Sequence, residues 1–99
     1  MEFLVEFEIN VPEGTPASEV EARQSAEAVA AARLADQGHV LRIWKRSVAP
    51  GETTVLGLYR ADSAAQLADL LGALPLYDWM EITVTALEPH PNDPAVARS

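Results

Sequence analysis

One glutamate of the chain, Glu27, is placed where it could act as a base. It lies in the middle of an alanine-rich segment with helical spacing, flanked by Ala26 and Ala28, and Arg23 precedes it by one helical turn. In one interpretation, Glu27 and Arg23 form a weak, exposed ion pair on the helix surface. In the other, Glu27 lies at the edge of an apolar pocket, where desolvation raises its pKa and lets it remove and return a proton.

Arg42 and Trp44 form a second pair of chemical interest. They are two residues apart in a segment rich in branched and aromatic residues, so on a strand their side chains share one face. A planar guanidinium matches a carboxylate, and an indole offers an apolar surface with one donor. The pair therefore suits a small organic anion with an apolar ring. The alternative is a cation–π contact or simple packing at a subunit contact.

Other kinds of chemistry find little support in the sequence. His39 and His90 lack a third ligand at a metal-binding spacing, so no metal site is predicted, although His90 could reach a neighbouring subunit's pocket. Tyrosines such as Tyr59 are more often packing residues than acids. The chain has no cysteine, which excludes disulfides and thiol nucleophiles. Neither a serine nucleophile elbow nor a glycine-rich phosphate loop is present.

Composition narrows the choice of partners. The 99 residues include 7 basic and 15 acidic side chains, giving a formal net charge of −8, and 48% are hydrophobic. This length and composition are typical of one globular domain. The acidic balance argues against nucleic acids and anionic membranes as partners. No apolar run approaches the roughly 20 residues of a membrane span, and the first residues do not resemble a secretory signal. A cytoplasmic location is therefore expected.

The pattern along the chain predicts four strands and two helices in the order βαββαβ. The expected strands are 2–10, 39–49, 53–61 and 81–85, and the expected helices are 18–37 and 63–73. This order is that of the α+β, ferredoxin-like fold, a four-stranded antiparallel sheet with both helices on one face. We expect this domain to span residues 1–88 and the proline-rich residues 89–99 to form an extended tail.

Local signals predict the ends and faces of the helices. Ser18 with Glu21, and Ser63 with Gln66, match the capping box that begins a helix. Gly38 is placed to end the first helix in the left-handed conformation. Apolar side chains in this helix recur at three- and four-residue steps and predict a narrow stripe toward the sheet, made of Val20, Ala26, Val29, Ala30 and Leu34.

Both sides of the strands carry large apolar residues, although helices can cover only one face of the sheet. The residues expected to face away from the helices are Leu4, Trp44 and either Leu56 with Leu58 or Val55 with Tyr59. An exposed apolar patch of this kind usually marks an interface or a ligand site. Self-association through the open face of the sheet is therefore expected.

Three segments, in order along the chain, resemble the muconolactone Δ-isomerase family. They are Met1-Glu2-Phe3-Leu4-Val5-Glu6 with Pro12, then Gly38-His39-Val40-Leu41-Arg42-Ile43-Trp44-Lys45, then Leu74 to Val84 with Leu87 and His90-Pro91. The third is the most specific, because Leu74-Pro75-Leu76-Tyr77 is similar to the family's Leu-Pro-Leu-Phe. Glu27 falls where the family has a glutamate in its first helix. The resemblance spans roughly residues 1–91.

The resemblance implies a ring-like homo-oligomer, commonly a decamer, that shifts a double bond in an unsaturated lactone during bacterial breakdown of aromatic compounds. It implies no metal or redox cofactor. The shift needs a base that carries a proton between two carbons and a donor for the dienolate oxygen. Glu27 is the predicted proton carrier, and Arg42 the predicted partner of the substrate carboxylate or the enolate. The predicted substrate-binding residues are Trp44, His39, Tyr59 and Arg23.

Departures from the family's pattern leave the identity of the lactone substrate open. The hairpin loop through residues 48–52 is longer than in those isomerases, and Lys45 and Arg46 follow Trp44 where the family has an arginine and an apolar residue. Two alternatives stay open. One is a noncatalytic ligand-binding or assembly module on the same fold. The other is a related cofactor-free enzyme, such as a lactone dehalogenase, a lyase or a quinone-forming monooxygenase.

Overall fold

The computed structural model describes residues 1–46 and 54–97, and the predicted hairpin turn at residues 50–52 lies outside this range. The elements are β1 (Glu2–Ile9), α1 (Ala17–Asp36), β2 (Val40–Arg46), β3 (Thr54–Arg60), α2 (Ala64–Gly72), the short 3-10 helix η1 (Tyr77–Trp79), β4 (Met80–Leu87) and α3 (Pro94–Ala97). The predicted βαββαβ order is confirmed. The short helix η1, which was not predicted, inserts one turn between α2 and β4.

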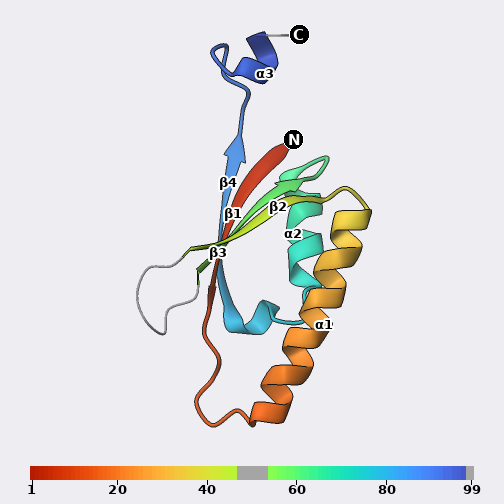
Figure 1. Cartoon of the computed structure of the whole chain (residues 1–99), viewed down its shortest axis with the longest axis vertical. Helices are drawn as coiled ribbons and strands as arrows, with labels where there is room; N and C mark the ends of the chain where they lie inside the picture. Colours follow the sequence, from red (N-terminus) through yellow and green to blue (C-terminus); the bar gives the residue numbers. More distant parts are fainter. Residues whose placement is uncertain (47–53, 98–99) are drawn as a thin grey trace.

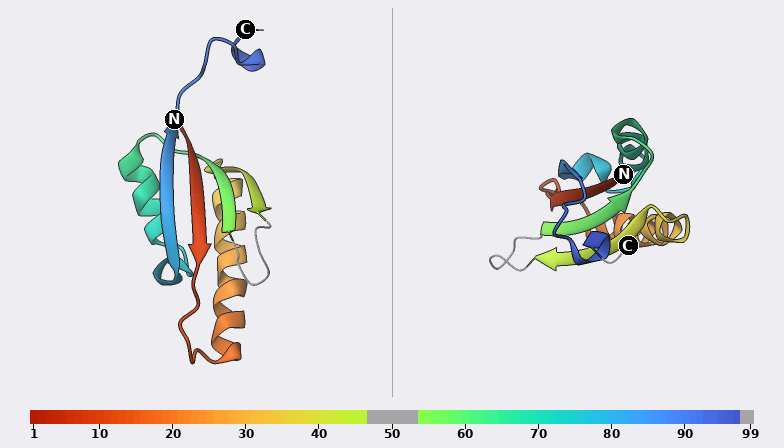
Figure 2. Two further views of the ribbon diagram at one scale, coloured as in Figure 1. Left: turned by 90° about the vertical axis from the view of Figure 1, so that its left-hand side faces the viewer. Right: turned by 90° about the horizontal axis from the view of Figure 1, so that it is seen from above.

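The four strands form one antiparallel sheet in the order β2-β3-β1-β4. Its two central strands are β1 and β3, with Phe3 opposite Tyr59 and Val5 opposite Gly57. Both long helices lie on the same side of the sheet, and the other side carries no helix (Figure 1; Figure 2). This is the ferredoxin-like arrangement that the sequence predicted.

The hydrophobic core fills the space between the sheet and the helices. Alternate residues of β1 point toward the helices, and Phe3, Val5 and Phe7 are almost completely buried there. The buried side chains of α2, Leu67 and Leu71, belong to the same cluster. Burying a side chain of this size contributes about 1.5–3 kcal/mol, so this part of the interior holds the two layers together.

The ends of the two helices follow the sequence rules unequally. Ser63 Oγ accepts the Gln66 N–H at 3.1 Å, so the second predicted cap is confirmed. The first is wrong, because α1 begins at Ala17 with Pro16 as its N-cap and has no side-chain cap, which places Ser18 inside the helix. Gly38 ends α1 with φ +83°, as predicted.

The open face of the sheet carries Leu56 and Leu58 rather than Val55 and Tyr59. Leu58 pairs with Leu4 of β1, and Leu56 pairs with Trp44 of β2, whose side chain is 41% exposed. The apolar patch is therefore present in the described structure. Self-association through it stays a prediction.

The C-terminal tail leaves the end of β4 and projects away from the sheet (Figure 1). It was expected to be extended throughout, but residues Pro94–Ala97 form a single helical turn. The turn has a local cause, because the Asp93 carboxylate accepts the Ala95 N–H at 2.9 Å and proline suits the first position of a helix. The domain boundary between residues 88 and 89 stays a prediction.

Candidate active site

Glu27 lies on the face of α1 that is turned toward the sheet. The residues of α1 that are at least partly buried are Val20, Arg23, Glu27, Ala30, Ala31 and Leu34, at steps of three and four residues. The stripe predicted from the sequence was therefore wrong in part, because Ala26 and Val29 are exposed. A stripe through Glu27 has the same three- and four-residue spacing. This spacing could have predicted that Glu27 faces the sheet.

The carboxylate of Glu27 is bound to the backbone rather than to a cation. Its Oε1 accepts the Leu76 N–H at 2.9 Å. The expected surface pair with Arg23 is wrong, since Arg23 instead contacts Glu19 at 3.6 Å and lies over the Trp79 ring at 4.4 Å from the centroid. Glu27 is thus held inward, with its second oxygen left for other contacts.

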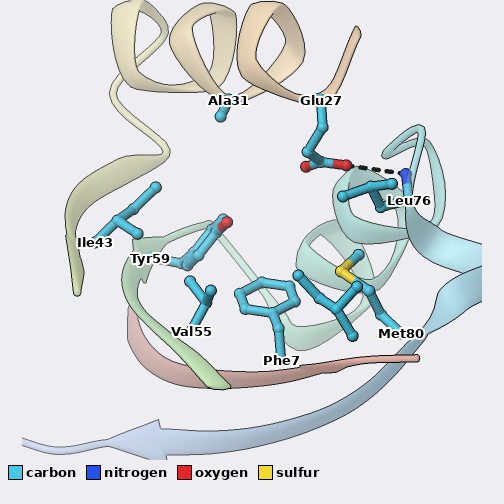
Figure 3. Close-up of a pocket in the computed structure, with 9 residues that line it drawn as sticks. Phe7, Glu27, Ala31, Ile43, Val55, Tyr59, Leu76 and Met80 are labelled. Carbon is cyan, nitrogen blue, oxygen red and sulfur yellow. Dashed lines mark hydrogen bonds between the residues drawn. The ribbon is translucent and has the colours of Figure 1, made fainter. Parts of the chain in front are cut away.

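The segment after α2 supplies that hydrogen bond. Pro75 cannot continue the helix, and the chain turns through η1, which Trp79 anchors by its burial. The Tyr77 N–H bonds to the Leu74 carbonyl and the Trp79 N–H to the Leu76 carbonyl. The Leu76 N–H is left without a backbone acceptor in this turn, and it points at Glu27 (Figure 3).

Glu27 borders a cavity of about 130 Å³ between α1 and the sheet. Figure 3 shows the carboxylate entering from the helix and aromatic and aliphatic side chains rising from the strands below. The lining residues are Phe7, Ile9, Glu27, Ala31, Ile43, Val55, Tyr59, Leu76 and Met80. Among them, only Glu27 and Tyr59 have a polar side chain. The cavity fits a small, mainly apolar molecule that meets one carboxylate and one hydroxyl.

The apolar walls shift the titration of both groups. Burial raises the pKa of Glu27 above its ordinary value of 4.5, and the Leu76 hydrogen bond opposes this only in part. Burial, with the nearby charge of Glu27, raises the pKa of Tyr59 to about 12. The cavity therefore holds a carboxylate that is a stronger base than usual beside a phenol that keeps its proton.

The remaining predicted site residues lie elsewhere in a single chain. Arg42 and Trp44 occupy the open face of the sheet, paired with Leu58 and Leu56, whereas Ile43 between them points into the cavity. The Arg42 guanidinium lies 5.1 Å from the centroid of the Trp44 ring. Within one protomer the structure therefore does not bring Arg42 to Glu27.

His39 and Arg23 also stay outside the cavity lining. His39 immediately precedes β2, and its Nδ1 is 2.8 Å from the Arg60 carbonyl oxygen. Arg23 reaches the Pro75 carbonyl at 3.4 Å and so flanks the turn that binds Glu27. Of the predicted substrate-binding residues, only Tyr59 lines the cavity. The apolar residues that line the cavity were not predicted, because strand alternation does not say which face of the sheet the helices cover.

The described ranges, 1–46 and 54–97, hold neither a metal-binding cluster nor a membrane-spanning helix. They contain no cluster of three or more histidine, aspartate or glutamate side chains suited to hold a metal ion. None of the helices in these ranges has the length and apolar character needed to span a bilayer.

Comparison with known proteins gives a consistent match along the chain. Residues 1–93 match the family described as muconolactone delta-isomerase. Muconolactone Delta-isomerase 1 of Acinetobacter lwoffii is 32% identical over 95 residues, which cover 93% of each chain. Muconolactone Delta-isomerase of Cupriavidus pinatubonensis is 29% identical and covers 93% of this chain and 97% of its own.

Solved structures agree with this match. A crystal structure of muconolactone isomerase superposes with a TM-score of 0.82 at 26% identity, and 95% of each chain is covered. A 5-chloro-2-hydroxyhydroquinone dehydrochlorinase from Burkholderia phenoliruptrix superposes with a TM-score of 0.63 at 14% identity, covering 94% of this chain and 99% of its own. The second likeness concerns the fold alone.

Proposed function

Because the chain belongs to the muconolactone Δ-isomerase family and is an isomerase, we propose that it moves the ring double bond of muconolactone or a closely related unsaturated lactone. The observation that carries the proposal is the partly buried Glu27 carboxylate facing an apolar cavity. In a noncatalytic module on this fold, the pocket would be closed or would lack a buried carboxylate. The described cavity has neither property, which favours the enzyme.

In the proposed reaction, Glu27 carries one proton between two carbons of the lactone ring. Its raised pKa makes the carboxylate a better match for a weakly acidic C–H bond, while it still ionises more readily than the substrate. The Leu76 N–H holds one carboxylate oxygen at a fixed position, and the other oxygen faces the ring. Positioned acid–base catalysis of this kind contributes about 10²–10⁴-fold to a rate.

For Arg42 and Trp44 we propose a place at a contact between copies of the chain. Both lie on the open sheet face with Leu4, Leu56 and Leu58, away from their own protomer's cavity. If either touches the lactone, it does so in the pocket of a neighbouring copy. This agrees with the homo-oligomer, commonly a decamer, that the family resemblance implies.

The assembly is tested by placing a charge on the open face. Leu58→Asp is expected to weaken self-association at least tenfold, measured by sedimentation velocity over a range of concentrations, because a charge buried between subunits is costly. Val29→Asp, which charges a 60% exposed position on α1, is the control. An unchanged oligomer in Leu58→Asp would place the contact elsewhere.

The activity is tested with purified protein and muconolactone, following the ultraviolet change as the double bond moves out of conjugation. In D₂O, the product should carry deuterium at the carbon that gains the proton, to the extent that Glu27 exchanges with solvent before returning it. Absence of turnover at high enzyme concentration would exclude muconolactone, and chlorinated and methylated butenolides would then be compared in the same assay.

A further inference from the structure

The hydroxyl of Tyr59 faces the cavity without a hydrogen-bond partner in the described part of the chain. Tyr59 is only 3% exposed, yet its hydroxyl points into the open space opposite Glu27 (Figure 3). It is the only side-chain N–H or O–H donor among the described lining residues, and the nearby Leu76 N–H is already used by Glu27. A donor of this kind in an apolar cavity is available to a ligand.

The ring of Tyr59 is held in this orientation by its neighbours on the sheet. Gly57, two residues earlier on the same face of β3, has no side chain, and a Cβ there would overlap the Tyr59 ring. Phe7 of β1 packs against the ring from the adjacent strand, with centroids 5.9 Å apart at 52°. A glycine inside a central strand weakens the strand, so its presence here has a packing reason.

The phenol remains a donor over the whole neutral range. Its pKa is about 12, because burial and the charge of Glu27 both disfavour the phenolate. Glu27 approaches from α1 and Tyr59 from β3, on opposite walls of the cavity (Figure 3). A flat five-membered ring between them would present a C–H bond to the carboxylate and its carbonyl oxygen to the phenol.

We infer that Tyr59 is a catalytic residue that donates a hydrogen bond to the lactone carbonyl oxygen while that oxygen carries the negative charge of the dienolate. The inference rests on the proposed function and assigns to Tyr59 the stabilisation of the enolate, which was one of the two roles predicted for Arg42. Glu27 takes the proton from the γ-carbon, and the electron pair moves through the ring to the carbonyl oxygen. The pair then returns to form a C–H bond at the α-carbon with the proton from Glu27. Tyr59 keeps its own proton, and no other reactant is needed.

Tyr59→Phe tests this role because it removes only the hydroxyl. We expect kcat to fall about 10²-fold with KM within about threefold of the wild type, as for the loss of one oxyanion donor. Tyr77→Phe is the matched control, since Tyr77 is 46% exposed and outside the cavity lining. An unchanged kcat in Tyr59→Phe, or a raised KM with unchanged kcat, would overturn the inference.

Gly57→Ala provides a second test through the position of the ring. The added methyl group displaces Tyr59, so kcat should fall in the wild-type background and fall much less in the Tyr59→Phe background. Equal losses in the two backgrounds would mean that Gly57 acts on the fold and not through the hydroxyl. Circular dichroism checks that each variant is folded.

A binding measurement separates this inference from the proposed function. Tetronate, the stable anion of a five-membered cyclic enol lactone, is titrated calorimetrically into Glu27→Gln and into the Glu27→Gln, Tyr59→Phe double variant. Loss of the phenol should weaken binding at least tenfold. If the wild type turns over no lactone, the proposed function fails, but equal tetronate affinities would still overturn the role of Tyr59 independently.

Discussion

The two long helices rest on the same face of one sheet, yet they use it differently. The shorter helix, α2, has nine residues, is capped at its start by the Ser63 side chain, and buries Leu67 and Leu71 in the core. The longer one, α1, has 20 residues, no side-chain cap, and one buried residue, Leu34. The longer helix therefore buries fewer residues than the shorter one.

The difference follows from what each helix turns toward the sheet. Leucines from α2 fill the space above the strands, whereas α1 presents Ala30, Ala31 and Glu27 in the corresponding place. Alanine is too short to fill the gap, so a cavity remains, and burial beside it raises the pKa of Glu27. The packing of α2 therefore stabilises the fold, whereas the packing of α1 leaves room for a site at some cost in stability.

The largest expected effect is at Glu27. Glu27→Gln keeps an oxygen for the Leu76 N–H but cannot accept a proton from carbon, so turnover should fall about 10²–10⁴-fold. The fold should be retained, because the variant removes a charge that burial disfavours. Glu21→Gln, at an exposed position of the same helix, should behave as the wild type. Steady-state rates and thermal melts check both statements, and full activity in Glu27→Gln would remove this residue from the mechanism.

The converse is expected at Leu67 of α2, which is 1% exposed. Leu67→Ala should lower the free energy of unfolding by about 2–5 kcal/mol, because it removes buried surface and leaves a cavity. The kcat of the molecules that remain folded should stay near the wild-type value. Denaturant titration measures the free energy of unfolding, and rates normalised to the concentration of active sites measure kcat. If Leu67→Ala abolished kcat in folded protein, the assignment of stability to α2 and of the site to α1 would be wrong.

A change of pH should move activity and stability in opposite directions. The raised pKa of Glu27 means that its base form is lost at a higher pH than for an ordinary glutamate, so kcat/KM should fall about tenfold per pH unit below that pKa. Since the folded state favours the protonated acid, its contribution to stability is present below pH 4.5 and is lost as pH rises through the raised pKa.

The measurement is a pH profile of kcat/KM together with unfolding curves at each pH. The groups that face Glu27 are Tyr59 on β3 and the Leu76 N–H, whereas Arg23, one turn earlier on α1, contacts the Pro75 carbonyl instead. Glu27→Gln should remove the Glu27 contribution to the pH dependence of stability. An acid limb at the pKa of a free glutamate would contradict the desolvated site.

Local patterns predicted most of the fold but only part of the site. Alternation along the strands predicted that Arg42 and Trp44 share a face, and this is confirmed. Which face the helices cover is decided by packing between distant segments, so alternation could not say that Ile43, and not its neighbours, meets the cavity. The hydrogen bond from Leu76 to Glu27 joins residues 49 positions apart, and no local pattern contains it.

The smallest expected effect compares the two serines that the same motif singled out. Ser63→Ala should cost about 1 kcal/mol, because it leaves the Gln66 N–H at the start of α2 without its acceptor. Ser18→Ala should change stability little or raise it slightly, since Ser18 lies within α1, caps nothing, and alanine is the better helix former. Chemical denaturation of the pair resolves this difference. Equal losses would mean that Ser18 does cap α1, and the contrast between the helix starts would then disappear.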